Sequence, residues 1–140
     1  MRFIINTSVI ISALMKRKSL GFYVILKTKH ELYIPEHAVN ELLEHIREIE
    51  EESELSTEEI YLRLILIAGR LNIVPRNDIL KCMKEAERII GHRDEKDVPF
   101  VATLLAIHGD GVVSYDNDFE EIEKHGYRWL KPSELIRGKK

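Results

Sequence analysis

Short runs of β-branched and aromatic residues recur along the chain, and such runs are typical of buried strands. The first, Arg2 to Ile5, is followed by a polar break, "NTS", before the chain becomes apolar again. Further runs precede Pro35 and Pro75, include "GVVSYD", and lie just before Pro132. We therefore predict five strands, at residues 2–5, 31–34, 72–75, 111–116 and 127–130.

The segments between these runs have helical periodicity or helix-end signals. Ser8 is the expected N-cap of the first helix, Ser56 and Glu59 have the spacing of a capping box, and Gly91 is an expected helix end. The predicted helices span residues 9–16, 20–29, 36–52, 57–71, 78–90 and 99–108, with a last one from Pro132 that frays over 137–140.

Strands that alternate with helices favour a parallel sheet covered by helices on both faces. We predict a single α/β domain over residues 1–140, with a three-layer α/β/α architecture and a central parallel sheet of four to five short strands. In such folds, functional side chains gather at the carboxyl ends of the strands.

Composition narrows the class of protein. With 44% hydrophobic and 32% charged residues the chain is typical of a globular domain, and no apolar stretch approaches the ~20 residues of a membrane span. Cys82 is the only cysteine, and we see no secretory signal, so a reducing cytoplasm is the expected location. The net charge of −3 means that nucleic acid would need a local basic patch. Glutamine is absent while Glu, Lys and Ile are abundant, which points to a thermophile.

The aspartates are unevenly distributed. Of the 24 acidic residues only 6 are Asp, and five of these lie between positions 94 and 118. Asp suits caps, turns and metal sites, whereas Glu suits helix surfaces. Asp94 and Asp97 precede a predicted helix, and Asp116 and Asp118 follow a predicted strand.

If the first strand and the strand of "GVVS" are neighbours, the polar residues that follow them meet at one edge of the sheet. Carboxylates that converge there repel one another unless a cation neutralises them, and Mg²⁺ or Mn²⁺ prefers such oxygen ligands. Such ions support phosphodiester cleavage. The candidate catalytic and metal-binding residues are Asn6, Glu41, Asp97 and Asp116. The candidate supporting residues are Asp94, Asp118, Ser114 and Thr7.

Each candidate also has a simpler interpretation. Asn6 could cap the first helix, Glu41 could be a surface residue of an acidic helix, and Asp97 has the spacing for a cap with Asp94. The stretch "YDND" has the composition of an ordinary turn. Lys16, Arg17 and Lys18 are candidate nucleic-acid contacts or a solvated loop.

The ordered set of motifs resembles the PIN-domain family, ribonucleases that include the toxins of VapBC-type toxin–antitoxin pairs. The motifs are "FIINTSVIISAL", "IPEHAVNELLEH", "DEKDVPFVATLLA" and "VVSYDNDF", and they occur in the family's order along nearly the whole chain. The resemblance implies a Mg²⁺- or Mn²⁺-dependent endoribonuclease that acts on RNA, pairs as a homodimer and is blocked by an antitoxin. A phospho-receiver domain also gathers acids at strand ends, but Lys131 lies in a poor position for the lysine of such a site.

One residue departs from the family pattern. Asn6 occupies the position where the family has its first Asp, which helps to hold the metal. The amide keeps a carbonyl oxygen but lacks the negative charge, so we expect weaker metal binding and low activity. Two explanations are open: an engineered inactivating substitution, and a natural degenerate member that binds RNA or protein instead of cutting.

Overall fold

The structure is a computed structural model and describes residues 1–136, so the predicted fraying of residues 137–140 lies outside the described residues. The strands are β1 (Arg2–Ile5), β2 (Glu31–Pro35), β3 (Leu71–Val74), β4 (Gly111–Val113) and β5 (Arg128–Leu130). The helices are α1 (Thr7–Met15), α2 (Leu20–Lys27), α3 (Glu36–Glu44), α4 (Ile46–Glu52), α5 (Thr57–Ala68), α6 (Arg76–Leu80), α7 (Met83–Ile90), α8 (Val98–Ala106) and α9 (Pro132–Ile136), with 3₁₀ helices η1 (Glu95–Asp97) and η2 (Asn117–His125).

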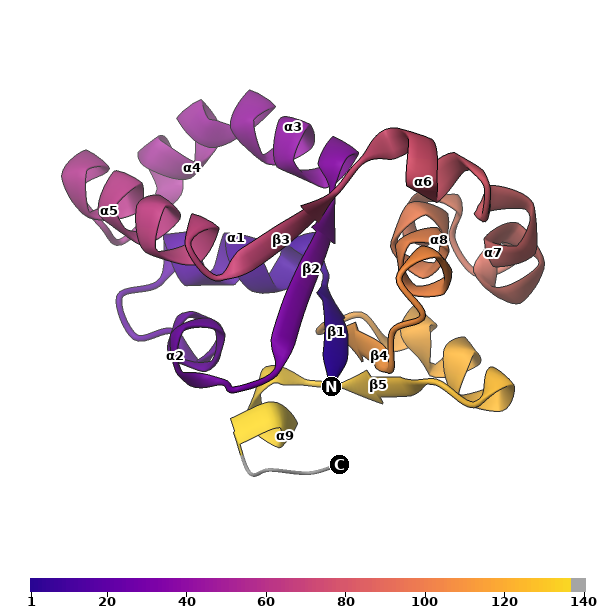
Figure 1. Ribbon diagram of the computed structural model, residues 1–140. Helices are drawn as coiled ribbons and strands as arrows, with labels where there is room; N and C mark the ends of the chain where they lie inside the picture. Colours follow the sequence, from indigo (N-terminus) through magenta and orange to yellow (C-terminus); the bar gives the residue numbers. More distant parts are fainter. Residues whose placement is uncertain (137–140) are drawn as a thin grey trace.

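The five strands form one parallel sheet in the order β3-β2-β1-β4-β5. Helices α1 to α5 lie on one side of the sheet and α6 to α8 on the other (Figure 1). The predicted three-layer α/β/α architecture is therefore confirmed. A receiver domain has the order 2-1-3-4-5 instead, so this order excludes that alternative.

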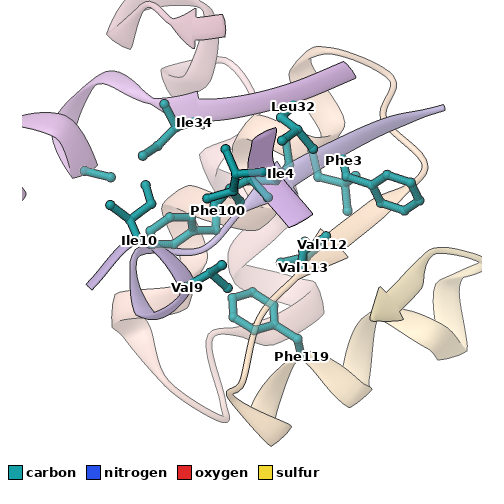
Figure 2. Close-up of a cluster of buried hydrophobic side chains, with 14 of the residues drawn as sticks. Phe3, Ile4, Val9, Ile10, Leu32, Ile34, Phe100, Val112, Val113 and Phe119 are labelled. Carbon is teal, nitrogen blue, oxygen red and sulfur yellow. The ribbon is translucent and has the colours of Figure 1, made fainter. Parts of the chain in front are cut away.

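The core lies on both faces of the central strand. Phe3, Ile4 and Ile5 of β1 are fully buried, as expected for a strand covered on both sides. Figure 2 shows side chains of α1, α8 and β4 gathered around this strand. At Gly111 a side chain would collide with the adjacent strand, since a Cβ atom there would lie 2.2 Å from the Arg128 carbonyl oxygen. Glycine therefore allows β4 and β5 to pair closely.

Two predicted helices are each divided in the structure. The helix predicted at 36–52 breaks at His45, and the one predicted at 78–90 begins at Arg76 and breaks between Leu80 and Met83. Neither break contains proline or glycine, and the buried stripe continues across the first one from Leu42 to Ile49. Because the apolar spacing persists, periodicity alone cannot reveal such a break.

Residues 114–118, directly after β4, are predicted from the sequence as the end of a strand or an ordinary turn. The strand ends at Val113, and residues Asn117–His125 form the 3₁₀ helix η2. Phe119 and Ile122 of this helix are fully buried, so burial against the domain holds a helix whose first residues signal only a turn in the local sequence.

Candidate metal centre

The site lies where the direction of chain winding reverses. From β1 the chain adds β2 and β3 on one side, and then β4 and β5 on the other. In open parallel sheets the crevice at the carboxyl ends of such strands is the usual place for a ligand. The register pairs Ile5 with Val113, so the next residues, Asn6 and Ser114, lie side by side at this crevice.

Asn6 is held by two hydrogen bonds to its side-chain oxygen. Asn6 Oδ1 accepts the Ser8 backbone N–H at 3.2 Å and the Ser114 hydroxyl at 3.1 Å. Asn6 is thus the N-cap of α1, and the prediction that Ser8 is the N-cap was wrong. The Ser8 hydroxyl instead accepts the Tyr115 N–H at 3.4 Å. The cap falls on Asn6 because β1 ends at Ile5 and the helix begins directly after Asn6.

Ser114 connects this cap to the acidic residues. Its hydroxyl donates to Asn6 and accepts the Asp116 backbone N–H at 2.9 Å. Ser114 is fully buried, so these bonds fix the backbone of Asp116 relative to the end of β1. Ser114 therefore supports the site by positioning an acidic residue.

Four aspartates converge beside the hydrogen bonds that join Asn6, Ser114 and Asp116, which we call the relay. Carboxylate oxygens of the four, one from each, all lie within 4.8 Å of one another. We refer to Asp94, Asp97, Asp116 and Asp118 as the aspartate cluster. Asp94 lies in the loop before η1, Asp97 ends η1 just before α8, and Asp116 and Asp118 follow β4, so the cluster depends on the tertiary fold.

Asp97 is the central member of the cluster because it is buried and incompletely bonded. It is only 5% exposed, and its Oδ2 atom has no hydrogen-bond partner among the described residues. It occupies the N-cap position of α8 but makes no side-chain capping bond there, so the capping interpretation does not explain this carboxylate. Burial, followed by repulsion from the three neighbouring carboxylates, raises the pKa of Asp97 to about 7.

Two other members of the cluster stabilise local turns. Asp94 Oδ1 accepts the Lys96 backbone N–H, and Asp116 Oδ1 accepts the Asp118 backbone N–H, both at 2.9 Å. Each turn engages one oxygen of the carboxylate. A capping role and a place in the cluster are therefore compatible for Asp94 and Asp116.

Glu41 faces the same cleft without joining the aspartate cluster. A cavity of about 230 Å³, which we call the acidic cleft, is lined by Asn6, Thr7, Ile11, Glu41, Leu42, His45, Lys96, Asp97 and Phe100. The Glu41 side chain is 59% exposed and lies 3.3 Å from His37 Nε2. Its role as a metal ligand stays a prediction.

Arg93 is a residue of the site that the sequence did not single out. Its guanidinium contacts Asp118 at 3.2 Å and the largely buried Glu121 at 2.9 Å. These contacts tie η2, which carries Asp118, to the segment that follows α7. The available signal was the position of Arg93 directly before Asp94, but its partners lie 25 and 28 residues away.

The basic triplet lies elsewhere in the fold. Lys16, Arg17 and Lys18 follow the C-terminal end of α1, whereas the site is at its N-terminal end. Arg17 pairs with Glu59 at 2.7 Å, and its backbone N–H donates to Glu54 at 2.8 Å. The triplet does not line the acidic cleft, so its contact with nucleic acid stays a prediction.

The donor set suits a hard divalent cation. Such ions bind carboxylate oxygens, and they relieve the repulsion that a group of close carboxylates otherwise experiences. The unpartnered Oδ2 of buried Asp97 is the specific observation in favour of this fit.

Comparison with protein families agrees with the fold and the site. A sequence model described as "PIN domain" matches residues 4–127, and the chain therefore belongs to the PIN-domain family. This is a nuclease fold, and PIN domains are typically dependent on divalent metals. A comparison with curated protein sequences finds no match. Within residues 1–136, no helix is both long enough and apolar enough to cross a membrane.

Proposed function

We propose that this chain is a PIN-type endoribonuclease dependent on Mg²⁺ or Mn²⁺, with activity limited by Asn6, and that it is the toxin of a toxin–antitoxin pair. The observation that carries the nuclease proposal is Asp97, a buried carboxylate with an unpartnered oxygen among three other aspartates. The toxin role rests on the resemblance of the motif order to VapBC-type toxins.

The aspartates and Glu41 have separate tasks in this proposal. Asp97 and Asp116 hold the cation, with Asp94 and Asp118 beside them and Glu41 across the acidic cleft. A bound cation would activate water and stabilise charge on the phosphate. Because the pKa of Asp97 is about 7, this group gives up its proton readily when a cation approaches at neutral pH.

Asn6 keeps the hydrogen bonds at the end of β1 but carries one negative charge fewer than an Asp would. The amide oxygen already accepts two hydrogen bonds, from Ser8 and Ser114, so it is a poor additional ligand. A carboxylate at this position can accept the same two bonds and adds one negative charge that attracts a cation. The substitution Asn6→Asp therefore repairs the charge without removing the cap.

The decisive experiment compares the chain with its Asn6→Asp variant. Cleavage of a labelled single-stranded RNA is measured in Mn²⁺ and in EDTA. We expect Asn6→Asp to raise metal-dependent cleavage at least about tenfold, because charged ligands and their partners typically change metal affinity by this order. Asp97→Asn on the Asn6→Asp background is the control for a contaminating nuclease, and it should remove the gain.

The second candidate is a degenerate PIN fold that binds RNA or a protein without cutting. The neutral, fully bonded oxygen of Asn6 favours it. If neither the chain nor Asn6→Asp cleaves RNA in Mn²⁺, the binding module becomes the better description.

A homodimer is part of the toxin proposal and has one supporting surface. An apolar cavity of about 310 Å³ lies among residues of α3, α5 and β3, and its lining includes Leu43, Tyr61, Ile65 and Ile73. Ile65 is 69% exposed, and exposed apolar side chains grouped in this way are typical of association surfaces. Light scattering should give a dimer for the chain and a monomer for Ile65→Asp.

A further inference from the structure

A second cavity adjoins the acidic cleft. This side cavity, of about 310 Å³, is lined by Glu36, His37, Asn40, Arg76, Ile79, Leu80, Met83 and Pro99. Four of these residues are apolar and come from α6, α7 and α8, while Glu36, His37 and Asn40 come from α3. Its volume is at the small end of the range for ligand pockets, which suits a ligand the size of one nucleotide.

Residues that line the two cavities are in contact with one another. His37 of the side cavity lies 3.3 Å from Glu41 of the acidic cleft, one helical turn further along α3. The His37 ring also contacts Phe100, which lines the acidic cleft, with ring centroids 5.8 Å apart. Pro99 and Phe100 are consecutive residues of α8 that line one cavity each. A chain that crosses the acidic cleft can therefore continue into the side cavity.

The charges of the side cavity are balanced. Glu36 supplies a carboxylate whose Oε1 accepts the Arg76 backbone N–H at 2.9 Å, and Arg76 supplies an exposed guanidinium. No carboxylate of residues 1–136 lies within 4.0 Å of that guanidinium, so it is available to a phosphate. A polyanion must approach an acidic site through such local cations, and Lys96 in the acidic cleft is another.

The remaining lining matches the chemistry of a nucleobase. Ile79, Met83 and Pro99 provide an apolar surface, and the His37 ring offers a face for stacking. The Asn40 amide can both donate to and accept from a base edge. Leu80, which is 52% exposed, adds another apolar side chain to the lining.

We infer that the side cavity is a nucleotide subsite, in which one unpaired base of an RNA strand lies between His37 and Leu80 while Arg76 holds its phosphate. This inference rests on the proposed function, since it assigns a place to a nucleotide that flanks the cleaved bond. It adds a site for base recognition outside the aspartate cluster.

The test measures binding without cleavage. A fluorescein-labelled single-stranded RNA of about 12 nucleotides is titrated in EDTA and followed by fluorescence anisotropy. Leu80→Ala is compared with Leu62→Ala, another leucine that is 57% exposed but lies on α5, outside both cavities. Arg76→Ala is compared with Arg88→Ala, which removes the same charge at a position outside both cavities.

We expect Leu80→Ala and Arg76→Ala each to weaken RNA binding about threefold to tenfold, with both controls near the unmodified chain. An oligomer of the same length with abasic positions separates the two contacts. Leu80→Ala should not change the affinity for that oligomer, whereas Arg76→Ala should still weaken it. Arg76→Ala should also reduce the slope of log affinity against log salt by about 0.7.

Equal affinity of Leu80→Ala and Leu62→Ala for RNA would overturn the subsite, as would an equal loss on the abasic oligomer. The cleavage assay on Asn6→Asp separates this failure from that of the nuclease proposal. If Asn6→Asp cleaves RNA and Leu80→Ala does not weaken RNA binding, only the subsite is wrong. If Leu80→Ala weakens RNA binding but Asn6→Asp does not cleave RNA, only the nuclease proposal is wrong.

Discussion

The two sides of the acidic cleft satisfy their polar groups in opposite ways. On the side of β1, the Asn6 oxygen is neutral and accepts two hydrogen bonds. On the side of α8, Asp97 is buried beside three other carboxylates and has an oxygen with no partner among the described residues. The Asn6 oxygen is fully bonded, whereas the repulsion around Asp97 is relieved when a proton or a cation binds.

This difference separates the geometry of a metal site from its charge. The relay from Asn6 through Ser114 to Asp116 keeps the acidic residues in place, and the neutral amide serves it as well as a carboxylate would. Under the proposed function, cation affinity depends on the charge around the aspartate cluster, and the neutral Asn6 adds none beside it. The proposal therefore predicts a site whose architecture is kept while its activity falls.

The largest expected effect on metal binding comes from neutralising Asp97, on the α8 side of the acidic cleft. Asp97→Asn should reduce Mn²⁺ affinity about tenfold to 100-fold, because it removes the buried carboxylate of the cluster. Titration calorimetry or the electron paramagnetic resonance signal of free Mn²⁺ measures this affinity. Asp78→Asn, on an exposed residue of α6, is the matched control. Equal affinities for the two variants would contradict the assignment.

The pH dependence of stability should differ between the two sides. Since the folded-state pKa of Asp97 is raised from 3.8 to about 7, the metal-free folded state holds this proton more tightly than the unfolded chain does. The free energy of unfolding should therefore fall as pH rises from about 4 to about 7, by at most about 4 kcal/mol from this group. Urea denaturation of the chain and of Asp97→Asn isolates the effect, which the variant should lack. A constant difference between the two across this range would show that Asp97 is ionised throughout.

Removing the hydrogen bonds of Ser114, on the β1 side, should lower the free energy of unfolding at every pH. Ser114→Ala leaves the Asp116 N–H without its acceptor and removes a donor from Asn6. We expect a loss of about 1–2 kcal/mol, the usual cost of an unsatisfied buried group, measured by urea denaturation at two pH values. Asn6→Asp, which keeps both acceptor roles, should not have this pH-independent loss. Unchanged stability in Ser114→Ala would mean that the relay contributes nothing.

The smallest effect should come from Glu41, which borders both sides. Its side chain is 59% exposed and lies outside the aspartate cluster, so Glu41→Gln should reduce Mn²⁺ affinity only about twofold to threefold. The same calorimetric titration measures it. A loss as large as that of Asp97→Asn would instead place Glu41 among the direct ligands.

Several features could be predicted because they depend on residues close together in the chain. The capping box of Ser56 and Glu59 is present, with both of its hydrogen bonds, and Gly91 ends α7. The apolar runs predicted all five strands to within a few residues. For β1 and β4 the reason is burial on both faces, which needs a continuous apolar sequence. The concentration of aspartates between 94 and 118 indicated the region of the site for a similar reason, since these short carboxylates occupy turns at strand and helix ends.

By itself, then, the sequence determined the alternation of strands and helices, the parallel sheet and the residues available for an acidic site. Only the tertiary structure decided which of those residues meet. The pairing of β1 with β4 brings Asn6 to Ser114 across 108 positions, and α7 and η2 bring Arg93 to Asp118. The tertiary structure also placed Asp94 inside the aspartate cluster and Glu41 outside it. The physical reason is that burial and repulsion act through space, so the raised pKa of Asp97 comes from neighbours that no local pattern identifies.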